Sequence, residues 1–235
     1  YVHPINEQWV AGFGAFTNYG LSTSFQDNHY AGPVAGKTSL TTLNLNPSIA
    51  FKLNNHLSLG AGFNAVYADA ELIRHKGLAS LQPLPNGFGG NATDELVRLS
   101  GDDWGYGWNI GLLFEADENN RWALTYRSEI DLTLEGNYSS ALPSILSYGP
   151  NNPGGTGGSS IPGSLDLTLP AIAEFSGYNK ISPDWALHYG LMWTEWSSFE
   201  ELRARDSQGN TLFQKDEKFK NSWRISAGTT HSLND

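Results

Sequence analysis

Apolar and polar side chains alternate along this sequence with a period of two, and that alternation constrains the fold more than any other feature. From Leu57 to Tyr67 the odd positions are apolar or aromatic, and the even positions up to Asn64 are Ser, Gly or Asn. A period of two places the two sets on opposite faces of a β-strand. The pattern returns at about residues 9–16, 43–53, 104–114, 122–134, 165–175, 185–193 and 223–227. The chain is therefore predicted to be all-β, with eight strands and no helix.

The connections between these strands differ in length in a regular way. Short polar turns are expected at 5–8, 53–56, 116–120 and 180–184, and they alternate with long loops at about 25–40, 75–102 and 138–163. Turns on one rim and long loops on the other are typical of an outer-membrane barrel. Several strands also reach the roughly 9 to 11 residues that a tilted strand needs to cross a bilayer.

The apolar face of these strands could contact either a second sheet or lipid. A large soluble sandwich would also alternate, but it has no reason to sort its loops by length. Aromatic residues gather near the strand ends, with Trp104 and Tyr106 at one rim and Trp122 and Trp185 at the other, as an interfacial girdle would. We therefore predict an antiparallel transmembrane β-barrel whose apolar face sees lipid and whose polar, glycine-rich face lines a lumen.

Composition excludes several classes of protein. The 235 residues fit one undivided barrel domain, 1–235. The formal charge of −10 argues against nucleic acid as a partner, because no basic stripe is available to replace counterions. The chain has no Cys, so it carries neither a disulfide nor a thiolate metal site. No apolar run approaches the roughly 18 residues of a membrane helix.

The sequence does not match the common catalytic and cofactor-binding motifs. "GPVAGKTS" at 32–39 has three residues between its glycines where a phosphate loop needs four. The 6 His residues are scattered without ligand spacing, and no G-x-S-x-G occurs. We expect no metal, no cofactor and no catalytic residue, so the chain is not expected to be an enzyme. A barrel-borne lipid hydrolase remains an alternative.

The lumen face is predicted to carry five charged residues, Arg74, Arg127, Glu129, Asp131 and Glu174. For Arg127 the favoured interpretation is structural, because opposite charges on adjacent strands pair across a lumen wall. Arg74 differs, because it lies at the loop end of its strand beside an apolar loop. Its guanidinium could receive a carboxylate while a hydrocarbon tail packs alongside. The alternative is a rim arginine paired with Asp94 or Glu95.

Two of the long loops are apolar for segments in water. The first carries Leu78, Leu81, Leu84 and Phe88, and the second reads "ALPSILSYG" at 141–149. Exposed clusters of Leu and Ile pack on each other or bind apolar ligands. The two loops could therefore form a groove above the barrel mouth.

Several motifs resemble one known family. They are "NYGL" at 18–21, "LNLN" at 43–46, "GFNAVYA" at 62–68, "WGYGWN" at 104–109, "NNRWALTYRSE" at 119–129, "GNYSS" at 136–140, "SGYN" at 176–179 and "TLFQK" at 211–215. Over almost the whole chain, and in order, these residues resemble the FadL family of outer-membrane long-chain fatty acid transporters. The resemblance implies a fourteen-stranded barrel with an N-terminal hatch. It also implies passive uptake through a loop groove, a lumen site and a sideways exit at a strand kink.

The resemblance assigns roles by position. Arg74 matches an arginine of the internal binding site. Thr17 and Gly20 fall on the strand whose kink opens laterally. The candidates for the capture groove are Leu78, Leu81, Leu84, Phe88, Leu142, Ile145 and Leu146.

The hatch and the last strands of the family are expected to be missing, so the chain should be a barrel segment that is incomplete at both ends and forms an open curved sheet. The resemblance implies a multi-pass protein of the bacterial outer membrane, in contact with its lipid and monomeric. The expected ligand is a long-chain fatty acid or another hydrophobic small molecule. Two alternatives remain: an aromatic hydrocarbon transporter, and a surface adhesin or receptor that acts through its loops.

Overall fold

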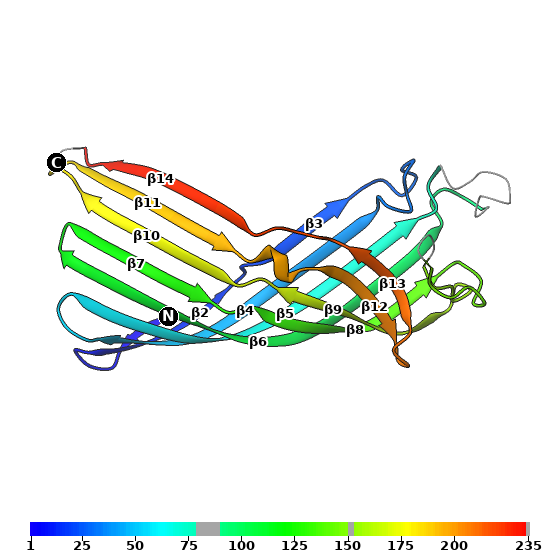
Figure 1. Ribbon diagram of the computed structural model, residues 1–235, viewed down its shortest axis with the longest axis horizontal. Helices are drawn as coiled ribbons and strands as arrows, with labels where there is room; N and C mark the ends of the chain where they lie inside the picture. The colour runs from blue at the N-terminus through cyan, green and yellow to red at the C-terminus, as the bar shows by residue number, and fades with distance from the viewer. Residues whose placement is uncertain (79–89, 150–152, 234–235) are drawn as a thin grey trace.

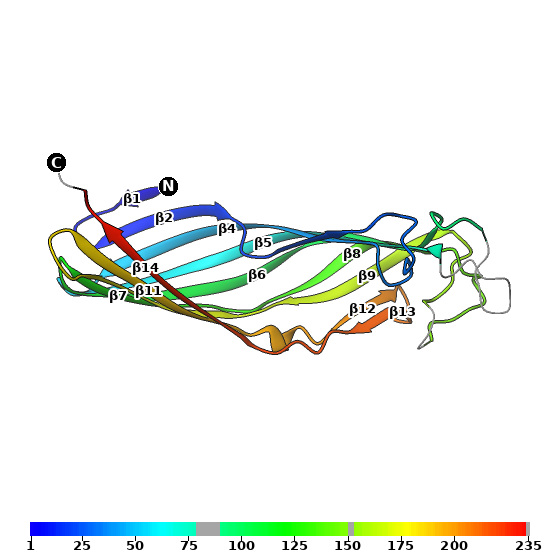
Figure 2. The ribbon, with the colours of Figure 1, turned by 90° about the horizontal axis from the view of Figure 1, so that it is seen from above.

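The computed structural model describes residues 1–78, 90–149 and 153–233, which form one strongly curved antiparallel sheet (Figures 1 and 2). Its strands are β1 (Val2–Pro4), β2 (Trp9–Phe16), β3 (Gly20–Ser24), β4 (Lys37–Lys52), β5 (Leu57–His75), β6 (Glu95–Asp117), β7 (Asn120–Arg127), β8 (Ile130–Ser140), β9 (Ser160–Leu169), β10 (Ile172–Lys180), β11 (Trp185–Thr194), β12 (Glu201–Asp206), β13 (Thr211–Asp216) and β14 (Ser222–His231). A short 3-10 helix, η2 (Trp196–Ser198), follows β11. Within the described ranges, no helix has the length and apolar character needed to cross a membrane.

The sheet has two halves that share the long, unbroken strands β4, β5 and β6. In the half with the short turns the order is β1-β2-β4-β5-β6-β7-β10-β11-β14. In the other half it is β3-β4-β5-β6-β8-β9-β12-β13. Each remaining long strand is thus broken near its middle into two pieces, such as β2 with β3 and β7 with β8. The path runs from β1 to β14 without closing on itself, so the predicted open sheet is confirmed.

The two ends of the sheet differ as predicted. Turns 5–8, 53–56, 118–119 and 181–184 lie at one end, on the left of Figure 1, and the long connections lie at the other. Those connections are shorter than expected, at 25–36, 76–94 and 141–159. The reason is that the strand ladders continue beyond the apolar region, to the pairs His75↔Glu95 and Ser139↔Ser160.

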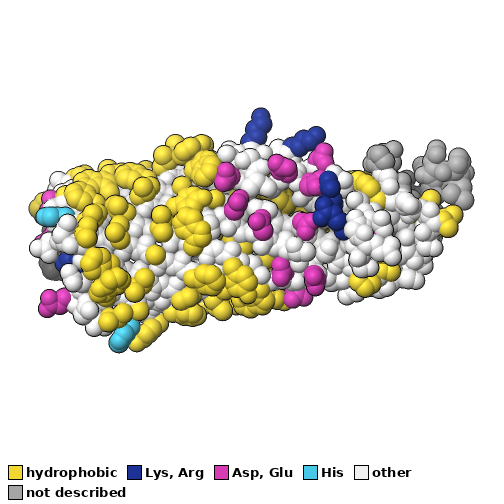
Figure 3. All heavy atoms as spheres, turned by 60° about the horizontal axis from the view of Figure 1, so that its bottom comes forward, with side chains coloured by type: hydrophobic (Ala, Val, Ile, Leu, Met, Phe, Trp, Pro, Cys, Tyr) yellow, Lys and Arg dark blue, Asp and Glu magenta, His cyan; other side chains and the backbone are white. Residues whose placement is uncertain are grey.

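The outer face of the sheet has an apolar belt and an acidic band. Figure 3 shows hydrophobic side chains gathered over the half with the short turns and Asp and Glu side chains over the middle. Aromatic pairs such as Tyr67–Trp104 and Phe114–Trp122, with ring centroids 5.4 and 6.0 Å apart, lie on the belt. This is the arrangement of a lipid-facing surface with aromatic borders, as the alternation predicts.

Partway along each unbroken strand, the polar and apolar residues change faces. This change can be read directly from the sequence. On β5 the inward side chain at Asn64 is polar, whereas Val66, Ala68 and Leu72 are apolar and buried. The outward side chains change in the opposite sense, from aromatic at Tyr67 to acidic at Asp69. Apolar side chains therefore point to lipid in the turn half and into the lumen in the loop half.

The broken strands reach the same result by changing register. On the strand formed by β7 and β8, the pairing with β6 moves from Asn109↔Arg127 to Asp102↔Glu135, which adds one residue to the broken strand. One extra residue reverses the facing of every later side chain. The apolar residues of β8 therefore point into the lumen, where Ile130, Leu132 and Leu134 are buried.

This reversal corrects part of the predicted lumen face. Asp131 lies on the outer face, where its carboxylate accepts a hydrogen bond from the Thr168 hydroxyl at 2.7 Å. Glu129 lies exposed in the break between β7 and β8. The expectation that both line the lumen as partners of Arg127 is wrong, because the extra residue between β7 and β8 interrupts the strict alternation.

Candidate functional site

An apolar cavity of about 840 Å³, here called the upper cavity, occupies the lumen side of the loop half. Its size lies within the range of about 300–1,000 Å³ typical of small-molecule pockets. Strand β3 lines it on one side and β13 with the segment after it on the other. Its apolar lining includes Leu21, Phe25, Leu40, Leu72, Leu99, Leu134, Leu165, Leu167, Leu169, Trp196, Phe199, Leu202 and Phe219.

Arg74 lines the upper cavity near the loop end of β5, on the lumen face as predicted. Its Nη1 donates to the carbonyl oxygens of Lys37 and Ile73 at 2.9 and 2.8 Å, and its Nη2 donates to the Thr38 hydroxyl at 3.0 Å. These bonds hold the guanidinium against β4, and among the described residues they leave two of its five N–H groups without a protein acceptor.

The alternative pairing of Arg74 with Asp94 or Glu95 is wrong. Asp94 pairs with Lys76 at 3.1 Å, and Glu95 pairs with Arg98, which lies on the outer face. The backbone N–H of Asn91 and the ammonium of Lys76 lower the pKa of Asp94 below its ordinary value. Among the described ion pairs, none includes Arg74. Its positive charge therefore remains available beside the cavity.

The floor of the upper cavity forms where β2 breaks into β3. The register moves from Phe16↔Asn44 to Gly20↔Thr41, so three residues, 17–19, stand opposite two. The Thr17 hydroxyl donates to the Tyr19 carbonyl at 2.9 Å, which stabilises the bend. Tyr19 is buried and reaches across the lumen, where its hydroxyl donates to the Pro170 carbonyl at 2.6 Å. We call residues 17–19 the partition.

A second cavity, of about 480 Å³ and here called the lower cavity, lies on the other side of the partition. Asn18 lines this cavity, whereas its neighbour Tyr19 lines the upper one. The lower cavity is more polar, because Asn46, Asn109, Arg127 and Glu174 also line it. The partition therefore separates a strongly apolar space from a more polar one.

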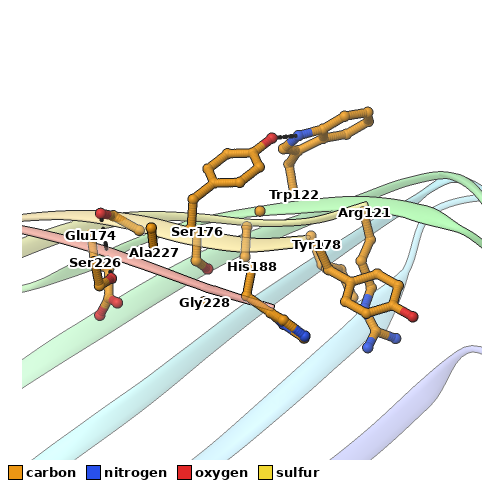
Figure 4. A pocket seen from close by; sticks show the side chains of 14 residues that line it. Arg121, Trp122, Glu174, Ser176, Tyr178, His188, Ser226, Ala227 and Gly228 are labelled. Atoms are coloured by element: carbon orange, nitrogen blue, oxygen red, sulfur yellow. Dashed lines mark hydrogen bonds between the residues drawn. The ribbon is translucent and has the colours of Figure 1, made fainter. Parts of the chain in front are cut away.

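A third cavity, of about 450 Å³, lies nearer the short turns (Figure 4). Arg121, Tyr178 and His188 point to its side of the sheet, and Trp122 points to the other side. The Arg121 guanidinium lies 4.6 Å from the centre of the Tyr178 ring. The His188 Nε2 lies 2.9 Å from the Thr230 hydroxyl. Charged and polar side chains thus line this end of the lumen together with apolar ones such as Leu113 and Ala123.

The predicted groove residues are distributed unevenly. Leu78 and Ile145 are exposed, at 53% and 88%, and Leu146 is also exposed. Leu142 is buried in the core cluster that contains Tyr138. Leu81, Leu84 and Phe88 lie outside the described residues. Thr17 is the first residue of the partition, and Gly20, which follows the partition directly, is the first residue of β3.

Two features of the lumen were missed by sequence reasoning. One is Tyr19, which was seen only as part of a family motif. The other is a cluster of inward Asn side chains on β4, β5 and β6, for which the alternate asparagines of "LNLN" were a usable signal. Among the described residues, no group of three or more His, Cys, Asp or Glu side chains could hold a metal ion.

The curved sheet, its lipid-facing belt and its partitioned lumen define the chain as wall of a transmembrane β-barrel. The sequence profile of the family described as "Outer membrane protein transport protein (OMPP1/FadL/TodX)" matches residues 1–235. The chain therefore belongs to this family of outer-membrane transport proteins.

Relatives and solved structures agree with this assignment. A long-chain fatty acid transport protein of Escherichia coli O6:H1 is 45% identical over 245 residues, covering 98% of this chain and 55% of the relative. The chain thus spans about half the length of the curated relatives it matches. A Pseudomonas aeruginosa FadL homologue superposes with a TM-score of 0.83 at 22% identity, covering 100% of this chain and 56% of that one. The Ralstonia pickettii toluene transporter TbuX gives 0.66 at 17% identity, covering 100% and 64%. These two likenesses show the fold.

Proposed function

We propose that this protein carries long-chain fatty acids, or closely related hydrophobic carboxylates, passively across the outer membrane. The observation that supports the proposal most is an apolar cavity with one lumen-facing arginine, Arg74, at its loop end. Relatives about 45% identical are named long-chain fatty acid transport proteins. The driving force would be burial of apolar surface, about 25 cal/mol per Å².

Arg74 would receive the carboxylate head group. Its hydrogen bonds to Lys37, Ile73 and Thr38 fix the plane of the guanidinium in advance. The arginine side chain therefore loses little conformational entropy when it binds a carboxylate. Hydrogen bonds between a guanidinium and a carboxylate are charge-assisted and stronger than neutral ones. The hydrocarbon tail would pack against the leucines of the upper cavity. Toluene has no carboxylate, so a hydrogen bond to Arg74 would add nothing to its binding free energy.

The entry and exit steps follow from the same geometry. Exposed apolar residues of the long loops, Leu78, Ile145 and Leu146, would capture the ligand above the cavity. The ligand would leave sideways at the break that contains Thr17 and ends at Gly20. A break in the ladder gives a passage through the wall without requiring the tail to enter the lower cavity, which is more polar than the upper one.

The proposal is tested by uptake of labelled oleate and labelled toluene. The protein, expressed from its complete gene, is placed in cells that lack their own transporter. Arg74→Ala is compared with Arg98→Ala, because Arg98 lies on the outer face and is paired with Glu71 and Glu95. Loss of one charge-assisted bond predicts a decrease in oleate uptake of about tenfold or more for Arg74→Ala and little change for Arg98→Ala.

Each result decides between functions. Oleate uptake that depends on Arg74 supports the carboxylate route. Toluene uptake indifferent to Arg74 would assign the protein to hydrocarbon transport. Uptake of neither molecule would refute the proposal and favour a receptor that acts through its loops.

A further inference from the structure

Four asparagines form a hydrogen-bonded cluster on the lumen face of β4, β5 and β6. Asn44 and Asn46 each donate to the Asn64 side-chain oxygen, at 2.9 and 3.1 Å. Asn46 and Asn64 each donate to the Asn109 side-chain oxygen, at 2.8 and 3.1 Å. Asn44, Asn46 and Asn64 are buried. Networks of this kind are rigid, because each amide is oriented by its neighbours.

The cluster holds the guanidinium of Arg127. Arg127 Nη1 donates to the Asn64 oxygen, which therefore accepts three hydrogen bonds. The guanidinium carbon lies 5.4 Å from the centre of the Phe16 ring, in a cation–π contact. The side chain is thus fixed by an amide on one side and by an aromatic ring on another.

Arg127 has no carboxylate partner among the described ion pairs. Within the described part of the chain, Arg127 makes one side-chain hydrogen bond, which uses one of its five guanidinium N–H groups. Glu174, which lines the same lower cavity, is absent from those ion pairs as well. A half-buried guanidinium without a counter-ion is costly, and an anion that contacts it would recover that cost.

Arg127 lies beside the break between β2 and β3, through which the ligand would leave the lumen. Phe16, which lies against the guanidinium, is the last residue of β2 before the partition. Arg127 lines the lower cavity together with Asn18 of the partition, on the side opposite the upper cavity. A head group that moves down from Arg74 would meet the Arg127 guanidinium at the same level as the break in the wall.

We propose that Arg127 is a second carboxylate site, which receives the head group at the partition while the tail turns toward the break between β2 and β3. This proposal rests on the proposed function and goes beyond it by adding a site after Arg74. The ligand class is a single carboxylate on an apolar chain. A neutral alcohol of the same length would pass Arg127 without forming a charge-assisted hydrogen bond to it, so it would gain little binding free energy there.

The test compares Arg127→Gln with Arg121→Gln, in the protein expressed from its complete gene. Arg121 is a matched control, because it also faces the lumen and also lies over an aromatic ring, that of Tyr178. Uptake of labelled oleate and labelled oleyl alcohol is measured for each variant. Equilibrium binding of oleate to purified protein is measured in parallel. Arg127→Lys tests whether charge alone is sufficient.

We expect Arg127→Gln to reduce oleate uptake by about tenfold, with oleyl alcohol uptake and oleate binding at the upper cavity retained. Arg127→Lys should restore part of the oleate uptake, and Arg121→Gln should leave it near that of the parent. Equal losses for acid and alcohol would show that Arg127 only supports the wall, and no loss would also overturn the proposal. Absence of oleate uptake by the parent protein would instead refute the proposed function.

Discussion

The hydroxyl of Tyr19 donates a hydrogen bond to the carbonyl oxygen of Pro170 at 2.6 Å, across 151 residues of sequence. Tyr19 belongs to the partition, and Pro170 lies in the break between β9 and β10. The bond therefore joins two breaks in the wall across the lumen. It closes the floor of the upper cavity with a side chain that is 8% exposed.

Tyr19→Phe should destabilise the protein by about 1–3 kcal/mol. The ring would remain in place, but the buried Pro170 carbonyl would lose the hydrogen-bond donor seen here. The free energy of unfolding is measured by urea titration in detergent, followed by tryptophan fluorescence. Tyr106→Phe is the control, because the Tyr106 side chain is exposed on the lipid-facing side and should change stability little. Equal effects of the two substitutions would contradict the role given to the Tyr19 bond.

The sequence was sufficient to predict strands, loop asymmetry and lipid-facing side chains where a strand runs unbroken. On β5 the exchange of faces is written in the residues themselves, from Asn64 to Val66 on one face and from Tyr67 to Asp69 on the other. On β7 and β8 the exchange of faces cannot be read from the residues. Leu124 and Leu132 are an even number of residues apart, yet they face opposite sides of the sheet. A bulge reverses the faces without leaving any trace in the alternation.

The site was predictable to a similar extent. Arg74 could be placed in the lumen because its strand is unbroken and its facing follows from counting. Tyr19 could not, because it lies in a break where no period applies and its partner Pro170 is remote in sequence. The asparagine cluster required knowledge of the register that brings Asn46, Asn64 and Asn109 side by side.

Chemical labelling of introduced cysteines should detect the reversal of facing on β8. These 235 residues contain no natural Cys, so none of them adds a labelling signal to that of a single introduced Cys. The protein without an introduced Cys gives the background. Asp131→Cys and Thr133→Cys should react with a membrane-impermeant maleimide on whole cells, because both residues are exposed on the outer face. Leu132→Cys and Leu134→Cys should react much more slowly, because they are buried in the lumen. Rapid labelling of Leu132→Cys together with protection of Asp131→Cys would support the uninterrupted alternation instead.

Three carboxylates lie in a row on the outer face, since Asp69 is directly opposite Asp102 and Asp102 is directly opposite Glu135. Like charges directly opposite one another on neighbouring strands destabilise a sheet. Asp102→Asn should therefore raise the free energy of unfolding by about 0.2–1 kcal/mol. The gain should shrink in 1 M salt, where the screening length falls to about 3 Å.

The neighbouring Asp103 provides the control for that measurement, because its carboxylate stabilises the fold by accepting hydrogen bonds. Its carboxylate accepts hydrogen bonds from the backbone N–H groups of Trp104 and Thr133, at 2.7 and 2.8 Å. Asp103→Asn replaces one accepting oxygen by a donor, so it should lower stability although it removes the same charge. If both substitutions stabilised the protein equally, general reduction of the acidic charge would explain the result, and the row of opposed carboxylates would not.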